Sequence, residues 1–524
     1  MESPKIKRVL MSVTDKTGIV GFAKTLVEEF GCQIISTGGT ARAIADAGVP
    51  VTPIDEVTQF PEMMDGRVKT LHPRVHGGLL AKRDDESHMA QASEHGIQMI
   101  DMVVVNLYAF EKTVESGADF GTCIENIDIG GPSMLRSAAK NFASVAVVTR
   151  PDTYEDILEE MRANDGRTTY ETRQQLALDV FTTTAAYDGA ISRWMGAQLA
   201  EAGEDAFASS VELGLKKKQS LRYGENPHQA AAFYTRDDYP NAATTLAQAL
   251  QLQGKELSYN NYLDLDAAWA AVREFDQPAC VIVKHLTPCG VCVDENVTVA
   301  YKRAHECDPV SAYGGVMAFN RPVTGDTVAA IFDNKQFVEA IVAPEFSGDA
   351  CEMYASKPNC RLLSTGGVNA PGEAVEYRSV EGGLLAQVSD SVVEGVDTFE
   401  VAGDVQPTSQ QMEELLFAWK AVKSVKSNAI LIAKDNASVG AGGGQPNRVN
   451  SARIAVEQAG DKAKGAVAAS DAFFPFRDGF DVLADAGVTA VIEPGGSIRD
   501  EEVIQAANEK GVALVFTGHR HFRH

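Results

Sequence analysis

The chain has 524 residues, more than one hydrophobic core usually serves, so we expect at least two domains. Its 44% hydrophobic and 23% charged residues are ordinary for a globular protein, and no apolar run is long enough to cross a bilayer. The formal net charge of −25 argues against nucleic acid and anionic membranes as partners, because such a surface repels polyanions. A phosphorylated ligand must therefore be captured by local basic pockets.

The N-terminus and the cysteines indicate a cytoplasmic protein. The opening MESPKIKRVLMSV has no apolar segment before a small-residue cleavage site, so we expect no secretory signal. The eight cysteines are scattered along the chain, as is typical of reduced thiols and not of a disulfide scaffold.

The first 150 residues alternate apolar strands with helical patterns, which predicts a parallel sheet covered on both faces. The expected strands are 8–13, 32–36, 102–107 and 144–148, and the expected helices are 18–30 and 41–47. Residues 151–200 are expected to be mostly helical, including 171–199.

The pattern breaks at 200–218, where small, charged and loop-favouring residues predict a domain boundary. A second α/β region follows, with strands expected near 280–283, 316–319, 429–433, 466–469 and 488–492. Segments 281–293 and 424–435 both place a lysine beside a short apolar strand, which suggests two similar subdomains.

Two segments of the first region, SVTDKTG at 12–18 and STGGT at 36–40, have the pattern of anion cradles. Each follows a strand and opens a helix, where backbone N–H groups and hydroxyls can surround a phosphate. Taken singly, each also suits an ordinary helix cap. Neither matches the P-loop pattern, so ATP binding is not indicated.

A basic loop and two strand ends point to one site. GRVKTLHPRVHGG at 66–78 is strongly basic, which suggests an anionic ligand although a solvated loop would also fit. NLYAF at 106–110 ends a buried strand, and IDIGG at 127–131 places an aspartate before a helix. Ligands bind at the carboxyl ends of strands in open parallel sheets. We therefore expect Lys69, Tyr108, Asp128 and Lys140 to meet there.

The second region offers further candidates. Lys284 and His285 follow a buried strand, as a general base and its electrostatic helper would, although such a pair alone is more often structural. GAGGGQPNR at 440–448 can wrap an anion or form a tight crossover. DAFFPFRD at 471–478 fits core packing or a wall for a flat heterocycle.

A zinc deaminase is the rival enzyme class. Residues 288–292 supply the P-C-x-x-C half of its signature, but no histidine has a glutamate two positions later. The missing half argues against a metal site.

These segments, with LRYGENPHQ, VKHLTPCG, SAYGG, KSNAI and the terminal RHFRH, occur along the full chain in one order. In this the chain resembles the bifunctional purine-biosynthesis enzymes that join an AICAR (phosphoribosylaminoimidazolecarboxamide) formyltransferase to an IMP (inosine monophosphate) cyclohydrolase. The resemblance implies an α/β fold with a methylglyoxal-synthase-like parallel-sheet domain at 1–200. Two cytidine-deaminase-like subdomains without zinc would follow at 201–524, divided at about 365/366.

The resemblance also implies ligands and partners. The enzyme would be a homodimer with formyltransferase sites at the subunit interface. It would use 10-formyltetrahydrofolate as co-substrate, act on AICAR and formyl-AICAR to give IMP, and need no metal.

Catalytic roles follow from matching motifs. His285 would transfer the proton in formyl transfer, supported by Lys284 and Asn428, while Lys69, Tyr108, Asp128 and Lys140 would serve ring closure. The substrate-binding residues implied are Ser12, Thr14, Asp15, Lys16, Thr37, Gly38, Gly39, Thr40, Arg67, Val68, Thr70, Asn106, Ile129, Arg222, Tyr223, Gly314, Glu339, Arg448, Asp478, Ser497 and Arg520, and Phe473 would sit beside the folate. Glu339 replaces an aspartate found in some relatives.

Two other hypotheses remain. Domains similar to residues 1–150 also serve as effector-binding modules, and a stand-alone methylglyoxal synthase shares that fold. Both leave residues 201–524 unexplained.

Overall fold

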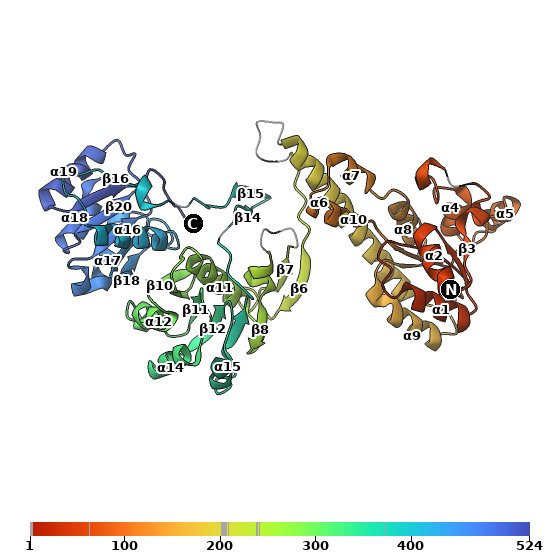
Figure 1. The fold of residues 1–524 in the computed structure, drawn as a ribbon, viewed down its shortest axis with the longest axis horizontal. Coiled ribbons are helices and arrows are strands. Elements are labelled where there is room, and N and C mark those ends of the chain that lie inside the picture. Colours follow the sequence, from red (N-terminus) through yellow and green to blue (C-terminus); the bar gives the residue numbers. More distant parts are fainter. Residues whose placement is uncertain are drawn as a thin grey trace. The chain divides into compact units, whose positions relative to one another are not determined.

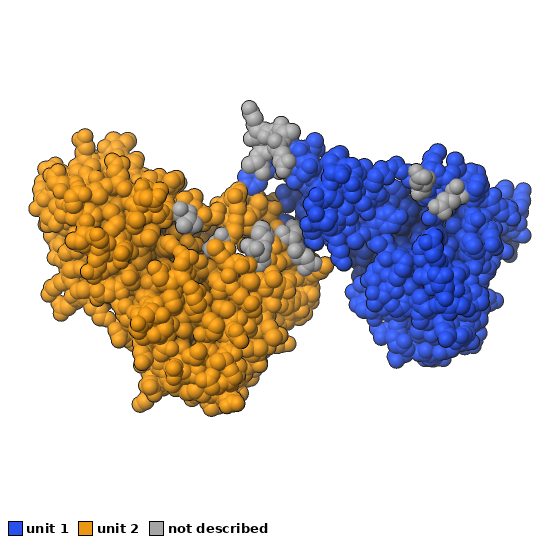
Figure 2. Space-filling model, viewed as in Figure 1, with its two compact units in different colours: residues 1–214 blue, residues 215–524 orange. Residues whose placement is uncertain are grey.

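The computed structural model describes residues 4–524 except 62, 201–206, 208, 237–238, 240–241, 371 and 393. The chain forms two compact units, Met1–Gly214 and Leu215–His524 (Figure 2). The division falls within the stretch 200–218, where the sequence pattern breaks.

Unit 1 is built on a five-stranded sheet in which every pairing is parallel, with the order β3-β2-β1-β4-β5. Helices surround this sheet (Figure 1). The strands are β1 (Arg8–Val13), β2 (Gln33–Ser36), β3 (Thr52–Pro53), β4 (Met102–Asn106) and β5 (Ala146–Val148). The helices are α1 (Ile19–Glu28), α2 (Gly38–Asp46), α3 (Ile54–Thr58), α4 (Pro73–Leu80), α5 (Glu86–Glu94), α6 (Phe110–Glu115), α7 (Phe120–Glu125), α8 (Gly130–Lys140), α9 (Tyr154–Ala163) and α10 (Tyr170–Ala200). The expected parallel α/β fold is confirmed.

Helix α2 begins earlier than predicted. The Gly-Gly pair at 38–39 suggests a turn from sequence, but both glycines already belong to the first turn of the helix. The first N–H groups of a helix lack intrahelical partners in any case, so this turn remains open to a ligand. The cradle at 36–40 is therefore a helix N-terminus.

Unit 2 contains a twelve-stranded sheet with the order β16-β21-β20-β19-β17-β18-β10-β9-β11-β12-β13-β8. Its strands are β8 (Leu250–Gln253), β9 (Ala279–Lys284), β10 (Thr287–Val293), β11 (Gly315–Phe319), β12 (Val338–Ala343), β13 (Arg361–Ser364), β16 (Glu400–Val401), β17 (Ile430–Lys434), β18 (Ala437–Gly442), β19 (Val467–Ser470), β20 (Ala490–Glu493) and β21 (Ala513–Phe516). Its helices are α11 (Tyr259–Val272), α12 (Val297–His305), α13 (Pro309–Ala312), α14 (Gly325–Asp333), α15 (Gly348–Tyr354), α16 (Ser409–Val422), α17 (Arg448–Ala459), α18 (Arg477–Asp485) and α19 (Asp500–Lys510). Two hairpins stand outside this sheet: β6 (Lys216–Leu221) with β7 (Ala231–Thr235), and β14 (Val375–Val380) with β15 (Gly383–Val388).

The two halves of unit 2 repeat one order of elements. Each half consists of a helix, a strand pair, a second helix, two strand–helix steps and a final strand. This order runs from α11 to β13 and again from α16 to β21, with only the short α13 added in the first half. Both α11 and α16 begin with a capping box, and each buries a tryptophan, Trp269 or Trp419, at the same helical position. The halves meet where β10 pairs with β18. The suggested internal similarity is thus visible in the fold.

Strand direction brings many loops to one edge of this sheet. Strands β9, β19, β20 and β21 end there, whereas β11, β12, β13 and β17 begin there, as follows from their parallel and antiparallel pairings. Lys284 is the last residue of β9, so we call this the Lys284 edge.

Candidate active sites

In unit 1, the ends of β1 and β4 are joined by the side chain of Asn106. Its Oδ1 accepts hydrogen bonds from the backbone N–H groups of Thr14 (2.6 Å) and Asp15 (3.0 Å), and its Nδ2 donates to the Asp15 carbonyl (2.9 Å). The sheet order reverses direction between β1 and β4, which is where ligands bind in open α/β sheets. Asn106 thus fixes the 12–18 loop at this point.

The cradle at 36–40 adjoins the same loop. The Ser12 and Thr37 hydroxyls are 3.0 Å apart, and Thr40 Oγ1 accepts a 3.0 Å bond from the Val13 N–H. These contacts tie the start of α2 to the end of β1.

Two lysines lie over the glycines of the cradle. A Cβ atom at Gly38 would lie 3.2 Å from Lys69 Nζ, and one at Gly39 would lie 3.7 Å from Lys16 Cε. A helix N-terminus flanked by two ammonium groups favours a phosphate. The side chains of both lysines therefore converge on one anion-binding position.

Asp128 lies before α8 and faces the same region. Its Oδ1 accepts a 2.8 Å bond from Gly131 N–H. Burial raises the pKa of Asp128, while hydrogen bonds from the backbone N–H groups of Gly131, Tyr108 and Gly130 partly offset that rise. A Cβ at Gly130 would lie 2.8 Å from Thr70 Oγ1, so the basic loop reaches the start of this helix.

The remaining unit 1 candidates divide into two groups. Arg67 forms an ion pair with Glu125 beside this region, and three neighbouring side chains are exposed there: Val68, Tyr108 and Ile129. Lys140 does not join them. It is the last residue of α8, which begins at Gly130, so the helical rise places it roughly 15 Å from the Asp128 end.

Sequence reasoning missed Tyr187 of α10. Its hydroxyl accepts a 2.8 Å bond from Asp128 N–H and donates to the Asn126 carbonyl at 3.3 Å. Nothing in the local sequence distinguishes Tyr187 from the other residues of the 31-residue helix α10. Its contact with the 127–131 turn forms only when the chain folds, because the two segments are far apart in sequence.

In unit 2, the Lys284 edge holds most of the residues predicted for formyl transfer. Lys284 Nζ donates to the Tyr313 carbonyl at 2.5 Å, and a Cβ at Gly314 would lie 3.6 Å from the same Nζ. Gly314 has φ +76°, a conformation that glycine adopts without strain, and its N–H donates to the Phe337 carbonyl at 2.8 Å. The lysine is thereby fixed against the start of β11.

His285 occupies a strained turn. His285 and Leu286 have φ of 53° and 63°, and the left-handed region is costly for leucine. The carboxylate of Asp264 in α11 accepts the N–H groups of both, at 3.3 Å and 2.7 Å. The repeated half makes the same turn with Asp435 and Asn436, residue types that tolerate it.

The predicted helper Asn428 is held by a buried network. Its Oδ1 accepts a 2.8 Å bond from Arg448, and its Nδ2 donates to the Gln445 carbonyl at 2.9 Å. Arg448 is 5% exposed and forms an ion pair with Asp471, whose other oxygen accepts the Ser427 hydroxyl. Asp471, missed from sequence, therefore orients both predicted residues.

Most of the other candidates belong to this edge or its loops, whereas Arg222 and Tyr223 follow a strand of the separate β6–β7 hairpin. Phe473 and Asp478 follow β19, Ser497 follows β20, and Arg520 follows β21. Glu339, near the start of β12, forms a 2.7 Å ion pair with Arg361. Arg222 follows β6, and its guanidinium lies 4.7 Å from the ring centroid of Tyr223.

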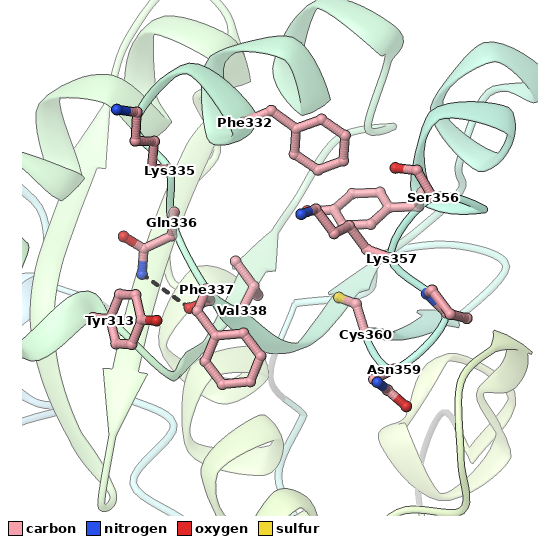
Figure 3. Close-up of a pocket in the computed structure, with 12 residues that line it drawn as sticks. Tyr313, Phe332, Lys335, Gln336, Phe337, Val338, Ser356, Lys357, Asn359 and Cys360 are labelled. Carbon is pink, nitrogen blue, oxygen red and sulfur yellow. Dashed lines mark hydrogen bonds between the residues drawn. The ribbon is translucent and has the colours of Figure 1, made fainter.

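Figure 3 shows a pocket of ≈ 580 Å³ that is lined in part by Tyr313, the residue whose carbonyl accepts the Lys284 bond. Its walls come from the ends of α14 and α15 and the starts of β12 and β13, and Tyr313 and Phe337 line it with ring centroids 5.7 Å apart. Lys335 and Lys357 also line it, whereas no carboxylate does. The aromatic and cationic lining suits a flat anionic molecule.

The two cysteines of the P-C-x-x-C segment, Cys289 and Cys292, are buried in β10, and burial raises the pKa of each to about 12. Among the described residues, no group of three or more His, Cys, Asp or Glu side chains is arranged to hold a metal ion.

Comparison with known proteins identifies the family. Residues 138–458 match the AICARFT/IMPCHase bienzyme family, and residues 18–133 match the MGS-like domain. The chain is 52% identical to the bifunctional purine biosynthesis protein PurH of Roseobacter denitrificans, over 99% of each chain. It is also 52% identical to PurH of Magnetococcus marinus, over 99% of this chain and 100% of that one.

The chain belongs to the AICARFT/IMPCHase bienzyme family. It is a bifunctional enzyme of purine biosynthesis with AICAR formyltransferase and IMP cyclohydrolase activities. A solved structure, that of ForH, is 36% identical and covers 36% of this chain and all of its own, with a TM-score of 0.34.

Proposed function

We propose that the two activities reside in separate units, formyl transfer at the Lys284 edge of unit 2 and ring closure at the cradle of unit 1. The strained His285 turn carries the first assignment, because a leucine and a histidine in left-handed conformations are retained only where the surroundings hold them. The convergence of Lys16 and Lys69 on the Gly38–Gly39 turn carries the second.

Formyl transfer requires help at two atoms. The 5-amino group of AICAR is a weak nucleophile, since its lone pair is delocalised into the ring and the carboxamide. His285 takes the proton as this nitrogen attacks the formyl carbon of 10-formyltetrahydrofolate, and Lys284 stabilises the oxyanion that forms. The bond from carbon to folate N10 then breaks, and N10 receives a proton. Asn428, fixed by Arg448, orients the nucleotide.

Ring closure joins the carboxamide nitrogen to the formyl carbon and releases water. Asp128 orients or deprotonates the amide, and Lys69 stabilises the oxyanion. Lys16, the cradle at 37–40 and Asn106 bind the phosphate and ribose. Tyr108 assists proton transfer. Lys140 would also assist proton transfer, as the resemblance implies.

The aromatic residues at the Lys284 edge fit the folate. Phe473 follows β19, and the pocket beside Tyr313 presents lysines to an acidic group. We also propose a cytoplasmic homodimer, as the resemblance implies. None of the described helices has the length and apolar character that crossing a membrane requires.

Reciprocal variants test the assignment. His285→Ala should lower formyl transfer by at least about 100-fold and leave cyclisation of supplied formyl-AICAR intact, while Lys69→Ala should do the reverse. Tetrahydrofolate and IMP are quantified separately after incubation with AICAR and 10-formyltetrahydrofolate. Loss of both activities in either folded variant would contradict two independent sites.

A further inference from the structure

The C-terminal segment is attached to the formyltransferase site by a buried histidine. His521 is 2% exposed, and its ring packs on Trp419 with centroids 5.0 Å apart. Its Nδ1 lies 2.6 Å from Asp390 Oδ2, and its Nε2 lies 3.1 Å from Glu394 Oε1. Neither the proposed mechanism nor the sequence motifs give this histidine a role.

The hydrogen-bond partners determine its charge. An ionised carboxylate only accepts hydrogen bonds, so a ring that bonds two of them must donate from both nitrogens and is therefore an imidazolium. Burial raises the pKa of Asp390 and of Glu394, but the hydrogen bond and the charge of His521, with smaller contributions from other neighbours, together outweigh burial and lower both. Burial lowers the pKa of His521, and the two carboxylates outweigh it and raise that pKa.

Other charged groups near the ring are few among the described residues. His519, on the same segment, is 3.9 Å from Glu394 and largely exposed. Lys423, which directly follows α16, lowers the pKa of Asp390 from a distance and is itself paired with Glu274 at 3.2 Å. The ring therefore faces two negative groups, and no other cation of the described residues lies as close to both.

The C-terminal segment around His521 also forms hydrogen bonds with residues of the proposed formyltransferase site. The N–H of His521 donates to the Asp471 carbonyl at 3.0 Å, and Ser427 N–H donates to the Arg523 carbonyl at 2.9 Å. Ser427 immediately precedes Asn428, and Arg520 immediately precedes His521. Moving this segment would displace both predicted substrate contacts.

We propose that His521, clamped as an imidazolium between Asp390 and Glu394, is a positioning residue that keeps Arg520 and Asn428 in place for formyl transfer. This inference rests on the proposed roles of those two residues. A group whose pKa is raised by folding contributes stability that is complete below its ordinary pKa of 6.5 and is lost as pH rises through the raised value. Binding of AICAR should therefore weaken as the pH rises through the raised pKa of His521.

The charge is tested directly by NMR of the intact chain labelled with ¹⁵N at histidine, with His521 assigned from the His521→Gln spectrum. Both ring nitrogens should carry protons in the imidazolium form, and the ring should titrate above pH 6.5. A ring that titrates at or below pH 6.5 would overturn the proposal.

The positioning role is tested by kinetics. His521→Gln should raise the KM for AICAR in formyl transfer by about 10- to 100-fold, the loss expected when a charge-assisted contact is misplaced, with a smaller change in kcat. The wild-type KM should rise with pH through the ring pKa, and this dependence should be absent in the variant. Unchanged KM with the pH dependence retained would contradict the proposal.

Two further variants control these results. His519→Gln, on the same segment but largely exposed, should leave the KM and its pH profile unchanged. Asp390→Asn removes one carboxylate and should shift both the ring pKa and the rise in KM to lower pH, a readout that remains if His521→Gln does not fold. If the wild-type chain fails to transfer formyl, the proposed function falls, whereas the ring titration still decides whether the clamp exists.

Discussion

One carboxyl group at each proposed site affects the stability of the fold, and the two act in opposite directions. Asp128 is partly buried without a described cationic partner, and Asp264 is used to hold two backbone N–H groups in an unfavourable turn. Such residues reduce stability or compensate for strain at positions where chemistry is expected. Each therefore gives a test that separates function from folding.

Asp128→Asn should stabilise the protein while removing ring closure. Burial raises the pKa of Asp128, and an acid with a higher pKa when folded destabilises the fold as it ionises, so stability falls as pH rises through that pKa. The amide keeps an acceptor for Gly131 N–H and carries no charge. We expect a Tm a few degrees higher near pH 7, no difference at pH 3, and cyclisation at least about 100-fold slower. A lower Tm at pH 7 would refute the burial argument.

Asp264→Asn should cost about 1–2 kcal/mol, because a turn N–H group then lacks its acceptor. Formyl transfer should slow by about tenfold as His285 loses its position, whereas ring closure should not change. Denaturant unfolding and both assays measure this.

The repeated half of unit 2 supplies the control for that variant. Asn436 makes the same turn without difficulty, so the cost of Asp264→Asn should be smaller in a Leu286→Asn background. Strictly additive effects would show that Asp264 does not compensate for the strained turn.

At the level of elements, the two halves of unit 2 share a close approach of strand to helix. A Cβ at Gly290 of β10 would lie 2.1 Å from the Ala304 carbonyl oxygen of α12, and one at Gly440 of β18 would lie 2.2 Å from that of Ala455 in α17. A backbone carbonyl cannot move aside to relieve such a close contact, whereas the end of a flexible side chain can. These glycines allow each strand pair to pack directly on its helix.

Gly290→Ala and Gly440→Ala should each cost about 3 kcal/mol or more, since strand or helix must move. Gly348→Ala is the matched control, because a Cβ there meets nothing within 4 Å and alanine favours the helix that it begins. Urea unfolding compares the three. Equal stability of all three would show that the strand–helix contact is not tight.

For the whole molecule, the decisive feature is the division into units with separate cores. Two buried clusters lie within residues 6–190, and three others lie within residues 246–515. Calorimetry should therefore resolve two transitions, with Asp128→Asn moving one and Gly290→Ala the other. A single transition moved by both variants would indicate one cooperative body.

The sequence determined the local elements and the identity of the chemistry. Strand 8–13 and the parallel α/β fold of unit 1 follow from apolar periodicity, and the motifs from SVTDKTG to RHFRH indicated the family that comparison confirmed. These features are local, so residue types and spacing suffice to reveal them. The residue roles remain proposals.

The tertiary structure decided which residues meet. Tyr187, Asp264 and Asp471 act through partners distant in the chain, and His521 finds its carboxylates more than a hundred residues away. Lys140 shows the converse, since a single helix carries it away from Asp128 although the two are close in sequence. Sequence spacing fixes distance within an element, but contact between elements depends on how strands pair and helices pack.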